Sequence, residues 1–249
     1  MNKYLNFQDI VAKSVVLLGI ALMILTRSAS GAGVTILTHG FQSSQRKVIW
    51  LDSMESVVQS QWIDALSLAP EGNTGLIMFD EIDGNFFPSI KAWPTAVGGS
   101  NAAEITVVLN WSAVAGIFTP IEETRSDSSS NNSEKIFSTT EVANSIVNLF
   151  TQPQLGLPPL VQLPIHLVGH SRGGSLVSEL ARLFGERGIW VDQMTTLDPH
   201  PLIFTDADPL VYENVLFADN YYQDNSTIFV PDGRPIAGAY NRLLGQTEL

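Results

Sequence analysis

Short apolar runs alternate along this chain with segments in which apolar residues recur every three or four positions. The runs with the length of buried strands are 34–38, 75–79, 105–109, 165–168, 190–197 and 215–218. Helical spacing appears at 50–62, after Ser138 and at 176–184. Strands that alternate with helices predict a mostly parallel sheet covered by helices on both faces. The pattern therefore predicts a single α/β domain.

The segments between these elements are of three kinds. Ser138 and Glu141 have capping-box spacing and predict the start of a helix. The stretch 84–100 is rich in Gly, Pro and aromatic residues, which favours a loop, and 126–133 is a Ser/Asn-rich segment that cannot support a core. Asp206 and Asp208, like the acidic residues near Asp80, do not follow calcium-loop spacing and are interpreted as solvated turns.

A candidate nucleophile lies at Gly169-His170-Ser171-Arg172-Gly173, between a predicted strand and a predicted helix. At such a turn the central residue is held in a strained conformation, and the flanking glycines let the neighbouring chain pass close by. The N-terminus of the following helix favours negative charge at that point. We therefore predict that Ser171 is a nucleophile, the alternative being a structural serine in a Gly-rich turn.

A second motif, His39-Gly40-Phe41, follows the strand predicted at 34–38. Acyl transfer converts a carbonyl oxygen into an anion, which two backbone N–H groups must stabilise. The amide after the nucleophile, that of Arg172, and the amide of Phe41 are the predicted donors, with His39 and Gly40 shaping the loop. His170, beside the nucleophile, and His166 are predicted to be packing or positioning residues rather than the base.

The ends and the charge of the chain bear on its location and partners. Lys3 and Lys13 precede an apolar run at 15–25, and small residues follow at 28–32, an order typical of a signal peptide. We expect residues 1–32 to be a signal peptide, or alternatively a membrane anchor, and residues 33–249 to form the domain. The formal charge of -12 argues against a nucleic-acid partner, and the lack of cysteine excludes a thiol nucleophile.

A carboxylate, Asp198, follows the strand predicted at 190–197 in the sequence Leu197-Asp198-Pro199. The chain resembles the α/β-hydrolase fold, and within it lipases of the pancreatic-lipase type. Four segments in the same order carry the resemblance: His39-Gly40-Phe41, 107–112, the turn at 169–173 that we call the elbow, and Leu197-Asp198-Pro199. The resemblance implies that Ser171 is the nucleophile, Asp198 the triad acid, and Phe41 and Arg172 the oxyanion donors. Asp219, predicted to follow the strand 215–218, is the alternative acid.

The expected base is missing from this sequence. In this fold the order is Ser, acid, His, yet the four histidines are His39, His166, His170 and His200. Three explanations compete: the chain stops short of its natural C-terminus, His200 serves as the base, or catalysis has been lost and the pocket kept. We favour the first, so we expect a fold that is incomplete at its C-terminus, and also compact because the strands that usually precede the one at 34–38 are missing.

These observations predict a secreted serine hydrolase that cleaves carboxylic esters through an acyl-enzyme on Ser171 and requires no cofactor. Its expected partner is a small ester or lipid substrate, with transient contact to a lipid interface. The alternative is a catalytically inactive binding protein on the same scaffold.

Overall fold

The computed structural model describes residues 33–40, 73–82, 85–95, 97, 104–115, 137–224 and 233–244. Some of the sequence predictions lie outside these ranges. They are the signal peptide at 1–32, the amphipathic helix at 50–62, the Ser/Asn-rich segment at 126–133 and the oxyanion donor Phe41.

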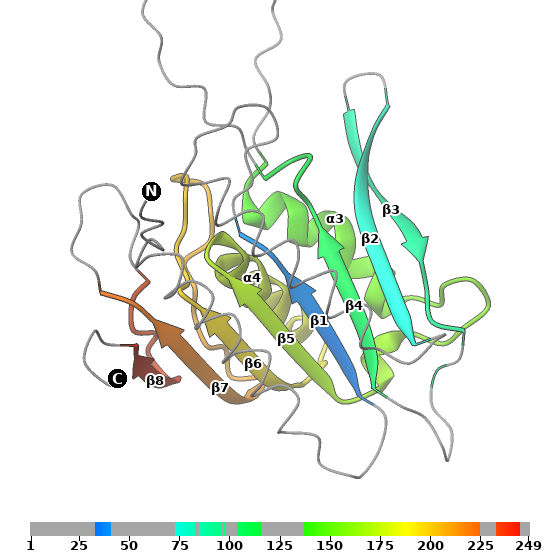
Figure 1. Cartoon of the computed structure of the whole chain (residues 1–249). Coiled ribbons are helices and arrows are strands. Elements are labelled where there is room, and N and C mark those ends of the chain that lie inside the picture. Colours follow the sequence, from blue (N-terminus) through cyan, green and yellow to red (C-terminus); the bar gives the residue numbers. More distant parts are fainter. Residues whose placement is uncertain are drawn as a thin grey trace, which may run out of the picture.

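The described residues form one sheet of eight strands (Figure 1). The strands are β1 (Val34–Thr38), β2 (Thr74–Ile82), β3 (Asn85–Ala92), β4 (Ile105–Asn110), β5 (Ile165–His170), β6 (Val191–Leu197), β7 (Val215–Tyr222) and β8 (Tyr240–Leu243). Their order is β3-β2-β4-β1-β5-β6-β7-β8, and every neighbouring pair is parallel except β2 with β3. The predicted α/β architecture with a mostly parallel sheet is therefore confirmed.

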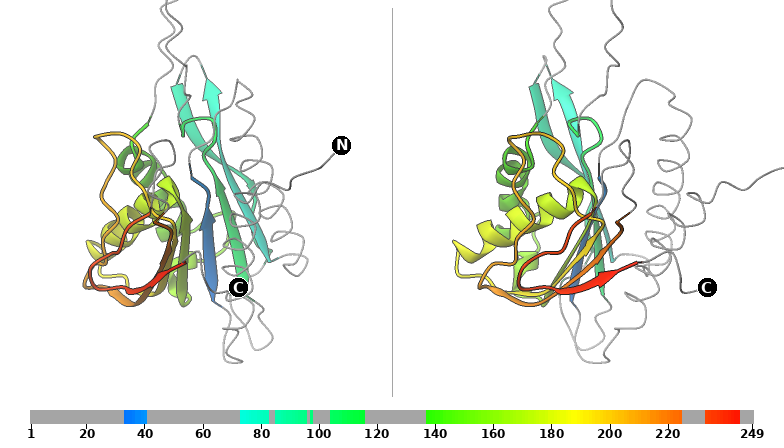
Figure 2. Two further views of the ribbon diagram at one scale, coloured as in Figure 1. Left: turned by 60° about the vertical axis from the view of Figure 1, so that its left-hand side comes forward. Right: turned by 90° about the vertical axis from the view of Figure 1, so that its left-hand side faces the viewer.

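Two α-helices, α3 (Thr139–Thr151) and α4 (Arg172–Gly185), lie together on one face of the sheet (Figure 2). A short 3-10 helix, η1 (Leu160–Gln162), precedes β5. Phe150 of α3 meets Phe184 of α4 edge to face, with ring centroids 6.3 Å apart. Both rings are buried with Leu167 in the main core, whereas Val168 belongs to a second apolar cluster. Within the described ranges, no helix is long and apolar enough to cross a bilayer.

The start of α3 confirms the predicted capping box. The Ser138 hydroxyl accepts a hydrogen bond from the Glu141 amide at 3.1 Å, and the Ser138 amide donates to the Glu141 carboxylate at 2.9 Å. Two amides that the helix leaves unpaired are thereby satisfied.

The prediction of a loop at 84–100 was wrong over Asn85–Ala92, which forms β3. This strand pairs antiparallel with β2 and lies at the edge of the sheet, where Pro88 faces Phe79 without interrupting a central ladder. A 2.5 Å ion pair between Lys91 and Asp80 joins the two strands. Strands β2 and β3 follow β1 in the chain but fill the edge of the sheet beyond β4.

Strand β7 is longer than the predicted run 215–218 and continues to Tyr222. Asp219 therefore lies inside a strand and not at its end. Its side chain is buried and accepts a 2.6 Å hydrogen bond from Thr195 on β6. The neighbouring Asn220 is likewise satisfied, by Thr196. Polar partners on the adjacent strand thus allow this strand to continue through residues that the pattern treated as its boundary.

Candidate active site

Ser171 lies between the last residue of β5, His170, and the first residue of α4, Arg172. Its backbone angles, φ 53° and ψ -123°, fall in a region that residues with a side chain rarely occupy. Such strain costs about 1–3 kcal/mol and is concentrated at functional sites. Ser171 is therefore held at a sharp bend at the carboxyl end of the central strand, next to a helix N-terminus.

The two glycines of the motif are required by close backbone contacts. A Cβ on Gly169 would lie 2.2 Å from the Gly173 carbonyl oxygen, and a Cβ on Gly173 would lie 2.6 Å from the His39 carbonyl oxygen. Both distances are well below any ordinary contact between carbon and oxygen. The glycines thus allow the strand, the helix and the 39–40 turn to meet around Ser171.

Asp198 follows β6, the strand beside β5, and lies next to the elbow. The Ser171 amide donates to the Leu197 carbonyl at 2.8 Å, and the His200 amide donates to the Ser171 carbonyl at 3.1 Å. Asp198 has a positive φ of 50°, and its Oδ1 accepts hydrogen bonds from the Gln223 and Gly233 amides at 3.0 and 2.9 Å. The structure therefore brings Ser171 and Asp198 to the same edge of the sheet and fixes the carboxylate there.

The turn at His39 and Gly40 touches the candidate nucleophile. A Cβ on Gly40 would lie 2.6 Å from the Ser171 Cβ and 3.0 Å from its hydroxyl oxygen. On the other side, Arg172 is the first residue of α4, and the first amides of a helix have no partner within it. The turn and the helix N-terminus thus converge on Ser171, as an oxyanion site requires.

His39 is buried and uses both ring nitrogens to hold the turn. Because the Gly40 carbonyl can only accept, Nδ1 carries the proton and donates to it at 2.7 Å, and Nε2 accepts from the Trp111 amide at 3.1 Å. The Trp111 indole N–H donates in turn to the His39 carbonyl at 2.9 Å. Burial, as the largest cause, lowers the pKa of His39 to about 4. This ring is a neutral support with no nitrogen left for a substrate proton.

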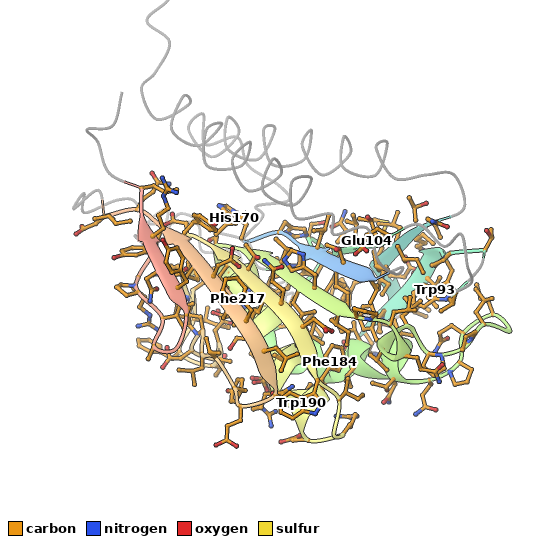
Figure 3. All side chains as sticks on the ribbon, turned by 90° about the horizontal axis from the view of Figure 1, so that it is seen from below. Trp93, Glu104, His170, Phe184, Trp190 and Phe217 are labelled. Atoms are coloured by element: carbon orange, nitrogen blue, oxygen red, sulfur yellow. The ribbon has the colours of Figure 1, made fainter. Side chains whose placement is uncertain are left out.

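Two further histidines lie on β5. His166 donates through Nε2 to the Thr195 hydroxyl at 2.8 Å, because that hydroxyl gives its own proton to Asp219. His170 and Phe184 appear on opposite sides of the sheet in Figure 3. Burial, as the largest cause, lowers the pKa of both histidines to about 4, and at His170 the repulsion that a protonated His39 would exert lowers it further. The remaining histidine, His200, donates a hydrogen bond from its backbone amide to the Ser171 carbonyl.

The side chain of Arg172 is buried and paired with Asp206, which sequence reasoning placed wrongly in a solvated turn. Arg172 Nε and Nη2 each donate to one carboxylate oxygen at 2.7 Å, and both side chains are at most 1% exposed. Burial alone would raise the pKa of the Asp206 carboxyl, but the hydrogen bonds and charge of Arg172 lower it below its usual value. Asp208 does form an exposed pair, with Arg234.

Comparison with known proteins adds little to this geometry. No protein-family model matches the chain, and no curated protein is significantly similar to it. A crystal structure described as a "putative cell surface hydrolase" from Lactobacillus plantarum WCFS1 is similar with 14% sequence identity and a TM-score of 0.35. The match covers 69% of this chain and 54% of that one, so the chain spans about half of that protein's length. At this TM-score the similarity establishes neither a shared activity nor a substrate.

Proposed function

We propose that this protein is a serine hydrolase that cleaves carboxylic esters through an acyl-enzyme on Ser171. The observation that carries the proposal is the conformation of Ser171, a strained non-glycine residue between a buried strand and a helix N-terminus, in contact with the turn at Gly40. A merely structural serine would have no reason to be held at this energetic cost.

In the proposed reaction the Ser171 oxygen attacks the ester carbonyl carbon while an imidazole takes the hydroxyl proton. The carbonyl oxygen becomes an anion, and the Arg172 and Phe41 amides donate to it. The imidazole then protonates the departing alcohol, and water repeats the sequence on the acyl-enzyme. Asp198, already fixed by two backbone amides, orients the imidazole.

The base is assigned to His200 or to a histidine outside this sequence. The pKa values of His39, His166 and His170 are all lowered to about 4, so these rings are neutral at pH 7, and two of them use ring nitrogens in bonds to other groups. His200 differs because its amide bonds directly to the Ser171 carbonyl. The resemblance to lipases supports an ester as substrate, and the order of residues in 1–32 supports export.

A fluorophosphonate probe tests this proposal, because it reacts with a serine only where base and oxyanion donors are assembled. We expect the native protein to be modified at Ser171, as read from the mass of the peptide that contains it. Ser171→Ala and the urea-unfolded wild type should remain unmodified. Hydrolysis of p-nitrophenyl esters would then define the acyl length. A folded full-length protein, with any downstream sequence included, that resists the probe would instead support a binding protein on this scaffold.

Comparing His200→Ala with His170→Ala assigns the base. Loss of labelling in His200→Ala but not in His170→Ala places the base at His200. Labelling that survives both substitutions excludes His200.

A further inference from the structure

Arg172 contributes two different groups to this region. Its backbone amide is the proposed oxyanion donor, whereas its guanidinium is fully enclosed beneath the elbow. Besides Asp206, the guanidinium donates to the carbonyls of Ala115 and, at 2.6 Å, Phe137. Its position is therefore fixed from several directions, and any movement of the side chain would be passed to the amide of the same residue.

Asp206 accepts more hydrogen bonds than pairing with Arg172 requires. Its Oδ1 also accepts from the Thr139 amide at 3.0 Å, and its Oδ2 accepts from the Leu202 and Ile203 amides at 2.9 and 3.1 Å. These donors belong to the start of α3 and to the segment that follows β6. One carboxylate thus joins the N-termini of both helices to the segment that begins at Asp198.

The network also reaches the other half of the proposed oxyanion site. The Arg172 guanidinium carbon lies 5.0 Å from the centroid of the Trp111 ring, within cation–π range. The same Trp111 donates its indole N–H to the His39 carbonyl and its amide to the His39 ring. Arg172 and Trp111 therefore connect Asp206 to both sides of Ser171.

We infer that Asp206 is a positioning residue, which aims the Arg172 amide at the oxyanion and fixes the segment that carries His200. This inference rests on the proposed function. Asp206 does not touch the substrate; it acts through the bidentate contact with Arg172, whose planar geometry sets direction as well as distance. A charge partner with no positioning role would affect folding but not the reactivity of the folded protein.

The test measures the second-order rate of Ser171 labelling by a fluorophosphonate, corrected for the folded fraction, in Asp206→Asn, Arg172→Gln and the double variant. Every variant keeps the backbone amide of residue 172. We expect each single variant to react about a hundredfold more slowly, because small displacements of catalytic groups cost rates of this order. The double variant should lose much less than the product of the two factors, since both changes break the contact between Arg172 and Asp206. With p-nitrophenyl esters, kcat should fall and KM should change little.

Asp208→Asn is the matched control, because Asp208 lies on the same segment in an exposed pair with Arg234. It should react at the wild-type rate. If Asp206→Asn does not fold, the double variant decides, because two amides replace the ion pair and leave no unpaired buried charge. A folded Asp206→Asn or double variant that is labelled at the wild-type rate overturns the inference alone. A full-length wild type, with any downstream sequence included, that is never labelled removes the proposed function and the inference together.

Discussion

Replacing Gly40 by alanine should disable the site while leaving the fold in place. The new Cβ would lie 2.6 Å from the Ser171 Cβ and 3.0 Å from the His170 carbonyl oxygen. Carbon atoms in contact are normally about 3.5 Å apart or more, so the turn and the elbow must separate by about 1 Å. A misplacement of that size lowers a rate by about a hundredfold, which corresponds to about 2.7 kcal/mol in the barrier. Overpacking should also cost about 1–3 kcal/mol of stability.

The assay pairs fluorophosphonate labelling of Ser171 with urea unfolding of the same samples. Gly188→Ala is the control, because Gly188 has a positive φ of 71° but no atom within 4 Å of an added Cβ. This control should lose about 1 kcal/mol from backbone strain alone and keep its full labelling rate. If Gly40→Ala reacts as fast as the wild type, the 39–40 turn does not shape the site and our account of the oxyanion hole fails.

Three other perturbations test the energetics of the region. Ser171→Gly should raise the free energy of unfolding by about 1–3 kcal/mol over Ser171→Ala, because glycine adopts φ 53° and ψ -123° without strain; equal stability would argue against strain. Asp206→Asn should lower the free energy of unfolding by about 3–5 kcal/mol at pH 7, because it leaves Arg172 as an unpaired buried charge. Asp208→Asn should change the same quantity by no more than about 0.5 kcal/mol. Folding lowers the pKa of Asp206, so its carboxylate stabilises the protein fully above about pH 4, and this stabilisation is lost as the pH falls through the pKa of the folded state. The difference in free energy of unfolding between the wild type and Asp206→Asn should therefore narrow in acid. Lastly, His39, His166 and His170 have pKa values of about 4, so their ring NMR signals should still show neutral imidazole at pH 5.5. Since the unfolded chain binds these protons near pH 6.5, stability should fall from there towards pH 4, and charged rings at pH 5.5 would contradict the burial described above.

The parts of this molecule that sequence reasoning predicted are those set by local pattern. The strand before Ser171, the helix after it and the cap at Ser138 all depend on neighbours within a few residues. The role of the glycines at 169 and 173 could also be predicted, because the strand-to-helix turn that carries a nucleophilic serine requires glycines at this spacing.

The features that were missed depend on contacts between distant residues. Asp206 reads as a surface turn until Arg172, 34 positions earlier, is placed beside it. The arginine itself could have predicted this pair. It is the first residue of a helix whose next residues are small or apolar, and a buried arginine needs an acidic partner. Strand β3 was missed because the Gly, Pro and aromatic content of its segment favours a loop, whereas a proline such as Pro88 is also compatible with an edge strand, and only pairing with β2 identifies that edge.

A backbone donor places an unusual limit on genetic dissection of this protein. Every amino acid except proline at position 172 supplies the same N–H, so any other substitution there changes only the aim of this donor and does not delete it. Removing the donor itself would take proline, which has no backbone N–H, or an ester in place of the peptide bond between Ser171 and Arg172, introduced by chemical ligation or an α-hydroxy acid. Tolerance of substitutions other than proline would therefore say nothing against the oxyanion role of the amide, although it would count against the positioning role of the Arg172 side chain.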